Sequence, residues 1–425
     1  MKRSYKRTIK ISLRTIFGKL KKRLIIIGGG ASGFFCAINA AIKNPDLNIL
    51  ILEKQPKVLQ KVKVSGGGRC NVTHACFSIA ELVKKYPRGK SFLKKAFTHF
   101  SPKDTIAWFE TRGINLKTED DGRMFPTTDS SQTIIDCLLN EVTKYNIDLR
   151  LNTEVLAIEK NVSHFSLQLK NGTTLQADYI FVGAGGFPKE EQYQWLQRLG
   201  HTIEKPAPSL FTFNIPDKKL HDLMGLSIAS TQVKIMGTKL QEAGPLLITH
   251  WGMSGPVILR LSAWGALELK QNNYEFTIFV NWLNESETQL RDRWNTIRNL
   301  QGSNKLVQKN PFGLQSRLWN YLLETAYINL ETKWSELASK DQNKLIHILT
   351  TQSFEVKGKT TFKEEFVTCG GIQLDEIDPN TMESKLVPGL YFGGEIINVD
   401  GITGGFNFQH AWTSGYIAGN HIGNK

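Results

Sequence analysis

The sequence predicts an α/β fold with a parallel β-sheet, and three neighbouring stretches near the N-terminus carry this prediction. Residues 24–27 and 48–52 are short apolar runs, typical of strands that are buried on both faces of a sheet. Between them, residues 28–33 read GGGASG, and residues 34–42 form an alanine-rich helical stretch. A strand, a turn, a helix and a second strand in this order form a βαβ unit, whose two strands are parallel.

The glycine turn of this unit has the GxGxxG spacing of a dinucleotide-binding site. Gly28 allows the tight turn, Gly30 lets a pyrophosphate approach the backbone, and Gly33 lets the helix pack closely on the strand. The helix N-terminus then offers free N–H groups and a positive dipole end to the phosphates. Glu53, at the end of the second strand, would accept hydrogen bonds from the ribose hydroxyls. The motif suits both NAD and FAD.

The positive charge of the chain is concentrated at its N-terminus. The 425 residues carry a formal net charge of +14, but residues 1–23 contain ten Lys or Arg and no acid, so the remainder carries +14 minus +10, or +4. We therefore do not expect a nucleic acid as a partner, because the charge does not form a patch with interleaved aromatic residues. We predict that residues 1–22 are a disordered leader, with a basic amphipathic helix on an anionic lipid surface as the alternative.

The sequence predicts no membrane span, no secretory signal and no metal site. No apolar run approaches the roughly 20 residues of a membrane span, and the leader lacks the apolar core of a secretory signal. The five cysteines form neither a CxxC pair nor a Cys/His cluster, so we expect no metal site and a cytoplasmic location. They are Cys36, Cys70, Cys76, Cys137 and Cys369.

A second glycine loop, Ser65 to Gly68, precedes Arg69, Cys70 and Asn71. Three consecutive glycines cost conformational entropy on folding, so something flat or charged is expected to approach this backbone closely. A simple hinge is the alternative, but a hinge does not account for the polar Arg69 and Asn71 that follow it.

Five motifs together make the chain resemble the HI0933-like, or BaiN-like, flavoprotein family, whose members are labelled NAD(P)/FAD-dependent oxidoreductases or aminoacetone oxidase family enzymes. The motifs are GGGASG (28–33), SGGGRCN (65–71), DGRMFP (121–126), FVTCGGI (366–372) and YFGGEIINVDGITGGFNFQHAWTSGYIAG (391–419). The resemblance implies a Rossmann-like, two-dinucleotide-binding FAD domain with an inserted β-rich domain and an inserted helical domain. It also implies an FAD-dependent oxidoreductase that transfers hydride through flavin.

The domain boundaries follow from this architecture and from the local patterns. We predict an FAD-binding domain over 23–205 and 362–425, a β-rich insert over 206–284 and 350–361, and a helical insert over 285–349. Within them, the patterns predict a helix that begins at Ser101 with a cap, a proline at its first position and an acid in its first turn. They also predict a helix that begins at Ser286 with a capping box, and a helix over 133–145. They also predict strands near 149–159, 163–170 and 174–182, the last two joined by an Asn-Gly turn.

The C-terminal block decides the cofactor in favour of FAD. Gly401, Gly404 and Gly405 form a turn before a helix over 407–417, whose N-terminus can stabilise the negative charge that gathers on a reduced flavin. The resemblance implies that Asp400 lies near the ribityl chain or the pyrophosphate. The glycines of 183–186 lack the third glycine of the fingerprint, so NAD(P)H, a possible electron donor, would dock directly against the flavin.

The complete set of candidate cofactor-binding residues draws on all of these motifs. It comprises Gly28, Gly30, Ala31, Ser32, Gly33, Glu53, Lys54, Ser65, Gly66, Gly67, Arg69, Cys70, Asn71, Val155, Ala184, Gly185, Gly186, Gly394, Glu395, Asp400, Gly401, Thr403, Gly404, Gly405 and Asn407.

Arg69, Arg123 and His250 are the candidate substrate-facing groups, and each has a structural alternative as a salt-bridge or capping partner. We expect a small organic substrate, with NAD(P)H as a possible second one. Two other functions stay open: a non-catalytic FAD-binding redox sensor, and a flavoprotein that acts on RNA. The family's small-residue loop after Gly186 is replaced here by FPKEEQYQ (187–194). The substrate of relatives is therefore a poor guide to the substrate of this chain at that edge of the site.

Overall fold

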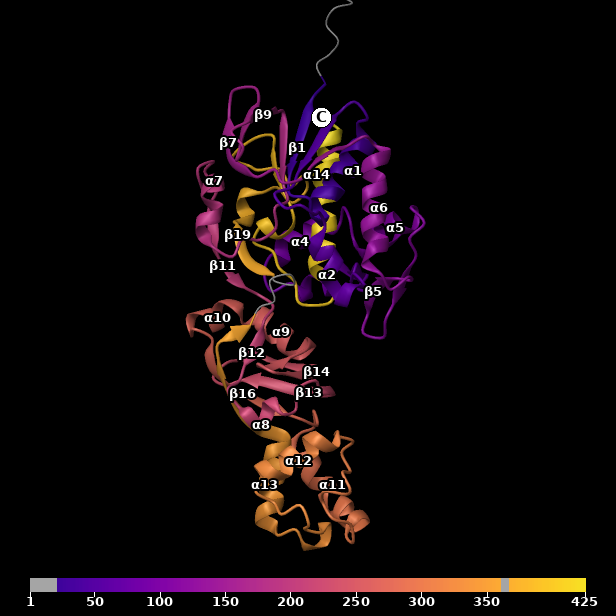
Figure 1. Ribbon diagram of the computed structural model, residues 1–425, viewed down its shortest axis with the longest axis vertical. Helices are drawn as coiled ribbons and strands as arrows, with labels where there is room; N and C mark the ends of the chain where they lie inside the picture. The colour runs from indigo at the N-terminus through magenta and orange to yellow at the C-terminus, as the bar shows by residue number, and fades with distance from the viewer. Residues whose placement is uncertain (1–20, 361–366) are drawn as a thin grey trace, which may run out of the picture.

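The computed structural model describes residues 21–360 and 367–425. The predicted leader, except for Lys21 and Lys22, therefore lies outside the described residues, and so does Phe366 of the fourth motif. The described chain forms an elongated molecule with three parts in a row (Figure 1). We call them the parallel-sheet part (21–202 and 373–425), the antiparallel-sheet part (209–283 and 352–360) and the helical part (284–351).

The parallel-sheet part contains a five-stranded parallel sheet with the strand order β20-β10-β1-β2-β6. The predicted βαβ unit is confirmed: β1 (Arg23–Ile27) and β2 (Asn48–Leu52) are parallel neighbours, joined through α1 (Ala31–Lys43). Both strands are apolar and almost entirely buried, as the sequence pattern requires. The remaining strands are β6 (Asp148–Arg150), β10 (Tyr179–Val182) and β20 (Leu390–Phe392).

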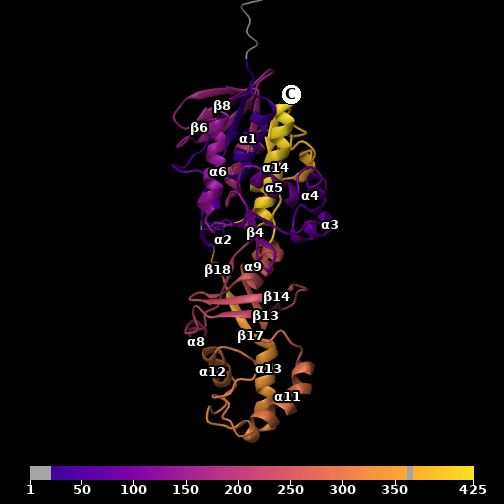
Figure 2. The same ribbon diagram turned by 90° about the vertical axis from the view of Figure 1, so that its right-hand side faces the viewer.

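The long C-terminal helix α14 (Phe406–Gly423) packs against α1 with unusually close backbones (Figure 2). A Cβ atom at Gly415 would lie 2.4 Å from the carbonyl oxygen of Ser32, and one at Gly419 would lie 2.5 Å from that of Cys36. Both helices therefore run in the same direction, and Gly415 is level with the start of α1. Since α14 begins about eight residues earlier, its N-terminus lies roughly 12 Å beyond that of α1.

Smaller elements surround this framework. The helices are α2 (Gln60–Gly68), α3 (Ile79–Leu82), η2 (Val83–Lys85), α4 (Lys90–Ala96), α5 (Pro102–Glu110), α6 (Ser131–Lys144), η3 (Glu190–Tyr193) and α7 (Gln194–Gln197). A small sheet joins β3 (Thr73–His74), β5 (Arg123–Pro126) and β4 (Leu116–Thr118), and an antiparallel meander joins β7 (Val155–Lys160), β8 (Phe165–Leu169) and β9 (Thr174–Ala177). The expected helix start at Ser101, Pro102 and Asp104 is confirmed at α5, where Ser101 and Asp104 form a capping box.

Two strand predictions need correction. The stretch near 149–159 is two strands, β6 and β7, and the stretch 174–182 is also two, β9 and β10. The second interruption falls at Asp178, whose carboxylate accepts the Arg23 N–H at 2.7 Å. This contact turns the chain out of the meander, so that β10 joins the central sheet beside β1.

The chain leaves and re-enters the parallel-sheet part along one antiparallel pair, β11 (Ile203–Pro208) and β19 (Thr368–Ile372). Between them lies a seven-stranded sheet with the order β17-β16-β13-β14-β15-β12-β18. Its strands are β12 (Thr212–Asn214), β13 (Ser227–Ile235), β14 (Gln241–Thr249), β15 (Gly252–Ser254), β16 (Glu275–Asn281), β17 (Gln352–Lys357) and β18 (Lys359–Thr360). The associated helices are α8 (Lys218–His221), α9 (Pro256–Trp264) and α10 (Ala266–Gln271).

The helical part consists of α11 (Glu287–Gln301), α12 (Ser316–Thr325), η4 (Trp334–Glu336) and α13 (Ser339–Thr351). The predicted capping box of Ser286 and Gln289 begins α11. The buried residues of the helical part and those of the antiparallel sheet belong to one hydrophobic cluster, which runs from Phe211 to Val356. The two predicted inserts thus share a core, and their division into separate domains stays a prediction. Within the described ranges, no helix combines the length and the apolarity that a membrane span needs.

Candidate functional site

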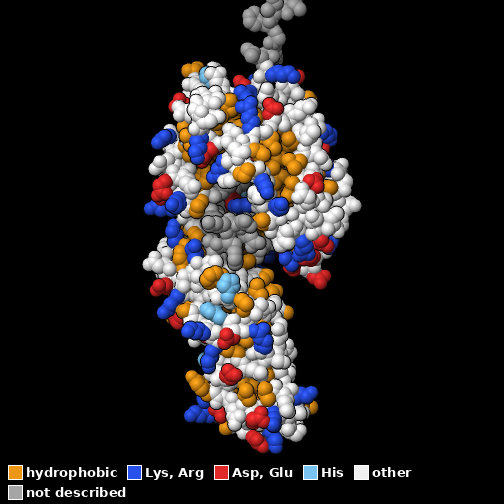
Figure 3. All heavy atoms as spheres, in the orientation of Figure 1, with side chains coloured by type: hydrophobic (Ala, Val, Ile, Leu, Met, Phe, Trp, Pro, Cys, Tyr) orange, Lys and Arg blue, Asp and Glu red, His pale blue; other side chains and the backbone are white. Residues whose placement is uncertain are grey.

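A cavity of about 610 Å³ is lined by residues of both the parallel-sheet part and the antiparallel-sheet part. Figure 3 shows several Lys and Arg side chains on the parallel-sheet part near its junction with the antiparallel-sheet part. Most of the candidate residues line this cavity, although they come from six separate stretches of the chain. They are Gly28, Gly30, Ala31, Ser32, Glu53, Lys54, Ser65, Gly66, Gly67, Asn71, Arg123, Ala184, Gly185, Gly394, Glu395, Thr403, Gly404, Gly405 and Asn407.

The N-termini of α1 and α14 both line the cavity. Gly30 and Gly405 are the residues that precede the first turn of the two helices, and neither end has a side-chain cap. Each end therefore leaves backbone N–H groups and a partial positive charge for a ligand. Because the two ends are offset by roughly 12 Å along parallel helices, they can contact two distant groups of one extended molecule.

The glycines of the cavity wall meet the demands of a large cofactor. Gly67 and Gly185 have φ angles of +70° and +77°, and a Cβ atom at either position would meet no other atom within 4 Å. Both residues line the cavity, so any side chain there would fill space that a ligand can occupy. Gly28 and Gly33 serve packing instead, since a Cβ atom on Gly28 would lie 2.4 Å from Gly183 O and one on Gly33 2.1 Å from Gly28 O.

A second pocket, of about 290 Å³, continues the first and shares Gly28, Glu53, Lys54 and Ala184 with it. Val155 lines this second pocket. The two cavities together form one elongated site that passes the N-terminus of α1 at its middle. This shape suits FAD, with the adenosine in the smaller pocket and the flavin in the larger one.

Glu53 is fixed in position at the junction of the two pockets. Its Oε2 accepts the Gly29 N–H at 2.8 Å, and its Oε1 accepts the Gln55 N–H at 2.8 Å. Each carboxylate oxygen has a further lone pair. Glu53 can therefore accept ribose hydroxyls as the sequence predicts.

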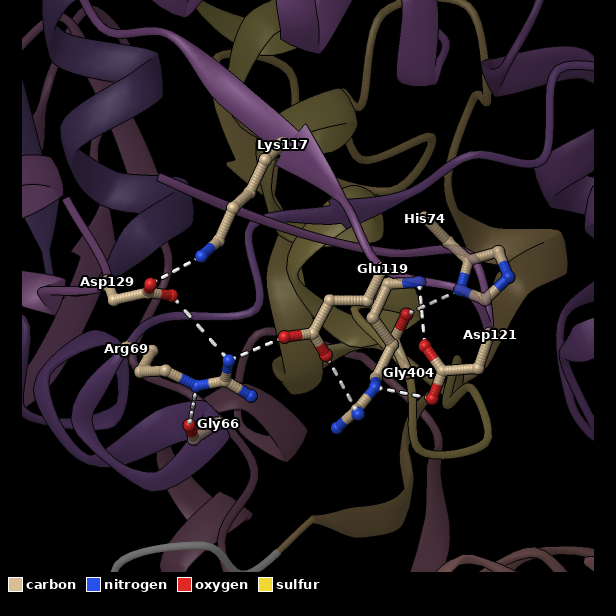
Figure 4. A network of polar contacts seen from close by, with 9 residues as sticks. Gly66, Arg69, His74, Lys117, Glu119, Asp121, Asp129 and Gly404 are labelled. Carbon is tan, nitrogen blue, oxygen red and sulfur yellow. Dashed lines mark hydrogen bonds and ion pairs between the residues drawn. The ribbon is translucent and has the colours of Figure 1, made fainter. Parts of the chain in front are cut away.

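A network of ion pairs at the edge of the cavity holds Arg69 and Arg123 (Figure 4). Arg69 donates to Glu119 at 2.5 Å and stacks over the Phe125 ring at 4.0 Å. Arg123 donates to the other Glu119 oxygen at 3.0 Å and pairs with Asp121 at 2.7 Å. Of the two arginines, Arg123 lines the cavity, so it is the better candidate for contact with a substrate.

His74 lies beside this network and fixes the turn before α14. Its Nδ1 lies 3.0 Å from the carbonyl oxygen of Gly404, and its ring stacks on Phe406. Burial lowers the pKa of His74, which favours the neutral ring with the proton on Nδ1.

Several candidates lie away from the large cavity. His250 is exposed at the turn between β14 and β15, with its ring against Trp251. Asp400 is fully buried outside the lining residues, and its two oxygens accept hydrogen bonds from Arg88 and Ser209, so its contact with a ribityl chain or pyrophosphate stays a prediction. Cys70 is buried, and burial raises the pKa of its thiol to about 12. Gly186 and Gly401 also fall outside the lining residues.

Other lining residues were not predicted from the sequence. Gly29 is part of the glycine turn, and a Cβ atom there would lie 2.6 Å from the Val58 side chain. Thr212 and Ser254 come from the antiparallel sheet and have their hydroxyl oxygens 3.2 Å apart. Both residues lie in the predicted β-rich insert, but nothing in a strand pattern indicates that one end of a strand faces a distant cofactor site. Among the described residues, no group of three His, Cys, Asp or Glu side chains could hold a metal ion.

His410 makes the stability of this site dependent on pH. Its ring is buried in α14, Nε2 lies 3.1 Å from Gly394 O, and Nδ1 has no partner in the described structure. Burial lowers its pKa to about 4. Because the unfolded chain binds a proton near pH 6.5 and the folded chain does not, the contribution of His410 to stability is full above that pH and falls on acidification, by up to about 3 kcal/mol at pH 4.

We expect the variant His410→Gln to lose this part of the pH dependence. The measurement is urea unfolding of wild type and variant between pH 7.5 and pH 4, since the difference between the two curves removes the contributions of other groups. Parallel curves for the two proteins would contradict the assignment.

Comparisons with known proteins agree with this geometry. The model of the family described as HI0933-like protein Rossmann domain matches residues 22–421. The ribosomal RNA dihydrouridine synthase of Escherichia coli strain K12 is 31% identical over 404 residues, which cover 92% of this chain and 96% of that protein. The enzyme of the same name from Haemophilus influenzae is 30% identical over 409 residues, which cover 92% of this chain and 96% of that protein. The 3-dehydro-bile acid delta(4,6)-reductase of Clostridium scindens is 27% identical, with 93% and 98% covered.

Proposed function

The chain belongs to the HI0933-like family of flavin oxidoreductases, and from this premise we propose that it reduces a carbon–carbon double bond conjugated to a carbonyl group, with FAD as cofactor. The observation that carries the proposal is the single elongated site onto which the N-termini of α1 and α14 both open. A non-catalytic FAD-binding redox sensor, the alternative left open by the sequence, does not agree with relatives that are enzymes.

The names of the relatives point to one type of reaction. A dihydrouridine synthase adds two hydrogens across a uracil ring double bond, and a delta(4,6)-reductase saturates double bonds of a keto compound. In both cases the double bond is polarised by a carbonyl group. Such a bond accepts a hydride at the carbon far from the carbonyl and a proton at the near carbon.

For the substrate, we favour a uridine of ribosomal RNA. Two relatives that carry this activity in their name match over almost the whole chain at 31% and 30% identity. A small organic ketone with a conjugated double bond is the second candidate, because the bile acid reductase matches over a similar length at 27% identity.

Different residues of this chain would bind the cofactor and polarise the substrate. The free N–H groups at the start of α1 would bind the pyrophosphate, and Glu53 would bind the adenosine ribose. The start of α14 would place its positive end near the electron-rich edge of the flavin. When bound, FAD supplies hydride chemistry, with NAD(P)H as the proposed source of electrons and the cytoplasm as the proposed location. Arg123, oriented by Glu119 and Asp121, would polarise the substrate carbonyl.

An anaerobic experiment tests the proposal. The holoenzyme is mixed with NADH or NADPH, flavin bleaching is followed, and either an unmodified ribosomal RNA transcript or a 3-keto-4-ene steroid is then added. We expect reoxidation of the flavin by the RNA, with digested nucleosides that contain uridine heavier by two hydrogens. Turnover of the steroid alone would select the second candidate, and reoxidation by neither compound would contradict the proposal.

A further inference from the structure

One stretch of the parallel-sheet part is far more basic than the rest of the described chain. Residues 54–103 contain twelve Lys or Arg and a single acid, Glu81. The residues after the leader carry only a small net charge, because acidic residues in other segments balance the positive charge of residues 54–103. Net charge alone therefore conceals a strongly positive region.

The centre of this region is α4. Phe92, Leu93 and Ala96 face the core, whereas Lys90, Lys94 and Lys95 are exposed on the other side. Within residues 21–360 and 367–425, none of these three lysines pairs with a carboxylate. Their charges are thus free to act on a ligand.

The positive region continues beyond α4 and includes an exposed aromatic ring. The short helix η2 contacts both α3 and α4, and it ends at Lys85. Lys85 is close enough to Cys76 to lower the pKa of that thiol, against the larger effect of burial. Phe77 follows Cys76 in the sequence and is 47% exposed, and the Lys103 ammonium lies 5.8 Å from the Phe77 ring. We name Phe77, Lys85, Lys90, Lys94, Lys95 and Lys103 the basic face.

The basic face adjoins the flavin end of the cavity. The Ile402 N–H donates to the carbonyl oxygen of Lys85 at 3.0 Å, and the next residue, Thr403, lines the cavity. On the other side of η2, a Cβ atom at Gly89 would lie 2.6 Å from the Val399 side chain, so the start of α4 packs on the same segment. Figure 2 shows α3 and α4 beside α14, next to the antiparallel-sheet part.

We propose that the basic face binds the sugar–phosphate backbone of an RNA substrate while one of its bases enters the cavity. This inference rests on the proposed function. Unpaired lysines bind phosphates through release of counterions, and an exposed aromatic ring offers a stacking surface for an unpaired base. A base that is reduced by flavin must leave its stack, so the RNA needs an anchor outside the cavity.

The test compares charge reversal on and away from the basic face in the full-length holoprotein. The variant is Lys90→Glu/Lys94→Glu/Lys95→Glu, and the matched control is Lys218→Glu/Lys219→Glu/Lys340→Glu, which changes the net charge equally at exposed lysines of α8 and α13. Binding of a ribosomal RNA transcript is measured over a range of salt concentrations. Flavin content and the unfolding midpoint report whether each variant is folded.

We expect the basic-face variant to bind the transcript at least about tenfold more weakly, with the slope of log K against log salt reduced by about 2, and the control to change less than about threefold. The neutral triple Lys90→Gln/Lys94→Gln/Lys95→Gln should give a smaller loss in the same direction. Equal binding by variant and control, or a loss of binding to phosphatidylserine vesicles without a loss of RNA binding, would overturn the inference.

The outcome also separates this inference from the proposed function. If wild type forms dihydrouridine in the transcript and the basic-face variant binds RNA as wild type does, the inference fails and the function stands. If wild type neither binds the transcript nor forms dihydrouridine, both the RNA substrate and the basic face are wrong.

Discussion

Replacement of Gly67 by leucine is expected to abolish FAD binding and leave the protein folded. Gly67 lines the large cavity with a φ angle of +70°, and no atom lies within 4 Å of the position a Cβ would take. The new side chain therefore meets no protein atom but fills the space of the ligand. A left-handed backbone costs a leucine roughly 1–2 kcal/mol, which a protein of this size tolerates. Flavin per protein, read from absorbance after purification, should fall at least about tenfold, because a clash in a rigid site costs more than about 1.4 kcal/mol of binding.

Gly113→Leu is the matched control for this substitution. Gly113 has a φ angle of +78° and equally open surroundings, but it is an exposed residue after α5 that does not line the cavity. The backbone strain is the same in both variants. Flavin retained by Gly67→Leu, or lost equally by Gly113→Leu, would show that the cavity is not where the cofactor binds.

Loss of either partner of the Arg88–Asp400 ion pair is expected to destabilise the protein by about 3–5 kcal/mol. The Asp400 side chain is fully buried, and that of Arg88 is 15% exposed. Arg88 also donates to Ala263 O at 2.8 Å and to the Ser209 hydroxyl at 3.1 Å. Either substitution, Asp400→Ala or Arg88→Met, therefore leaves a buried charge without its partner at the junction of the parallel-sheet and antiparallel-sheet parts.

Urea unfolding of the single variants and of Arg88→Met/Asp400→Leu measures this effect. The double variant should recover much of the lost stability, because it removes both charges together. Arg291→Met is the control: it breaks the exposed pair with Glu287 and should cost less than about 1 kcal/mol. Single variants that lose no more than the control would mean that the buried pair does not hold the junction.

Features that depend on neighbouring residues could be predicted from the sequence. The βαβ unit rests on periodicity and glycine spacing within about thirty residues, and the helix starts at Ser101 and Ser286 rest on residues within three positions of each other. The same holds for the glycine turns before α1 and α14, since a glycine is required wherever a Cβ atom would collide or block a ligand.

Features that depend on residues far apart in the chain could not be predicted from the sequence. Arg88 and Asp400 are 312 residues apart, so the sequence does not show that Asp400 has a buried protein partner. The 174–182 stretch looks like one strand because no glycine or proline interrupts it, whereas in the structure Asp178, which contacts Arg23, separates β9 from β10. The basic face was missed for a related reason, because a net charge averages the basic residues 54–103 with acidic segments elsewhere.

The central claim is that the N-terminus of α1 binds the pyrophosphate of an FAD molecule while the N-terminus of α14 lies at its flavin. Titration calorimetry of the apoprotein with FAD and with FMN tests it most directly, because FMN lacks the adenosine phosphate that α1 and Glu53 would hold. We expect one FAD per chain and binding of FMN weaker by at least about a hundredfold, equivalent to about 2.8 kcal/mol. Equal affinities for the two flavins, or no binding of FAD at all, would contradict the claim.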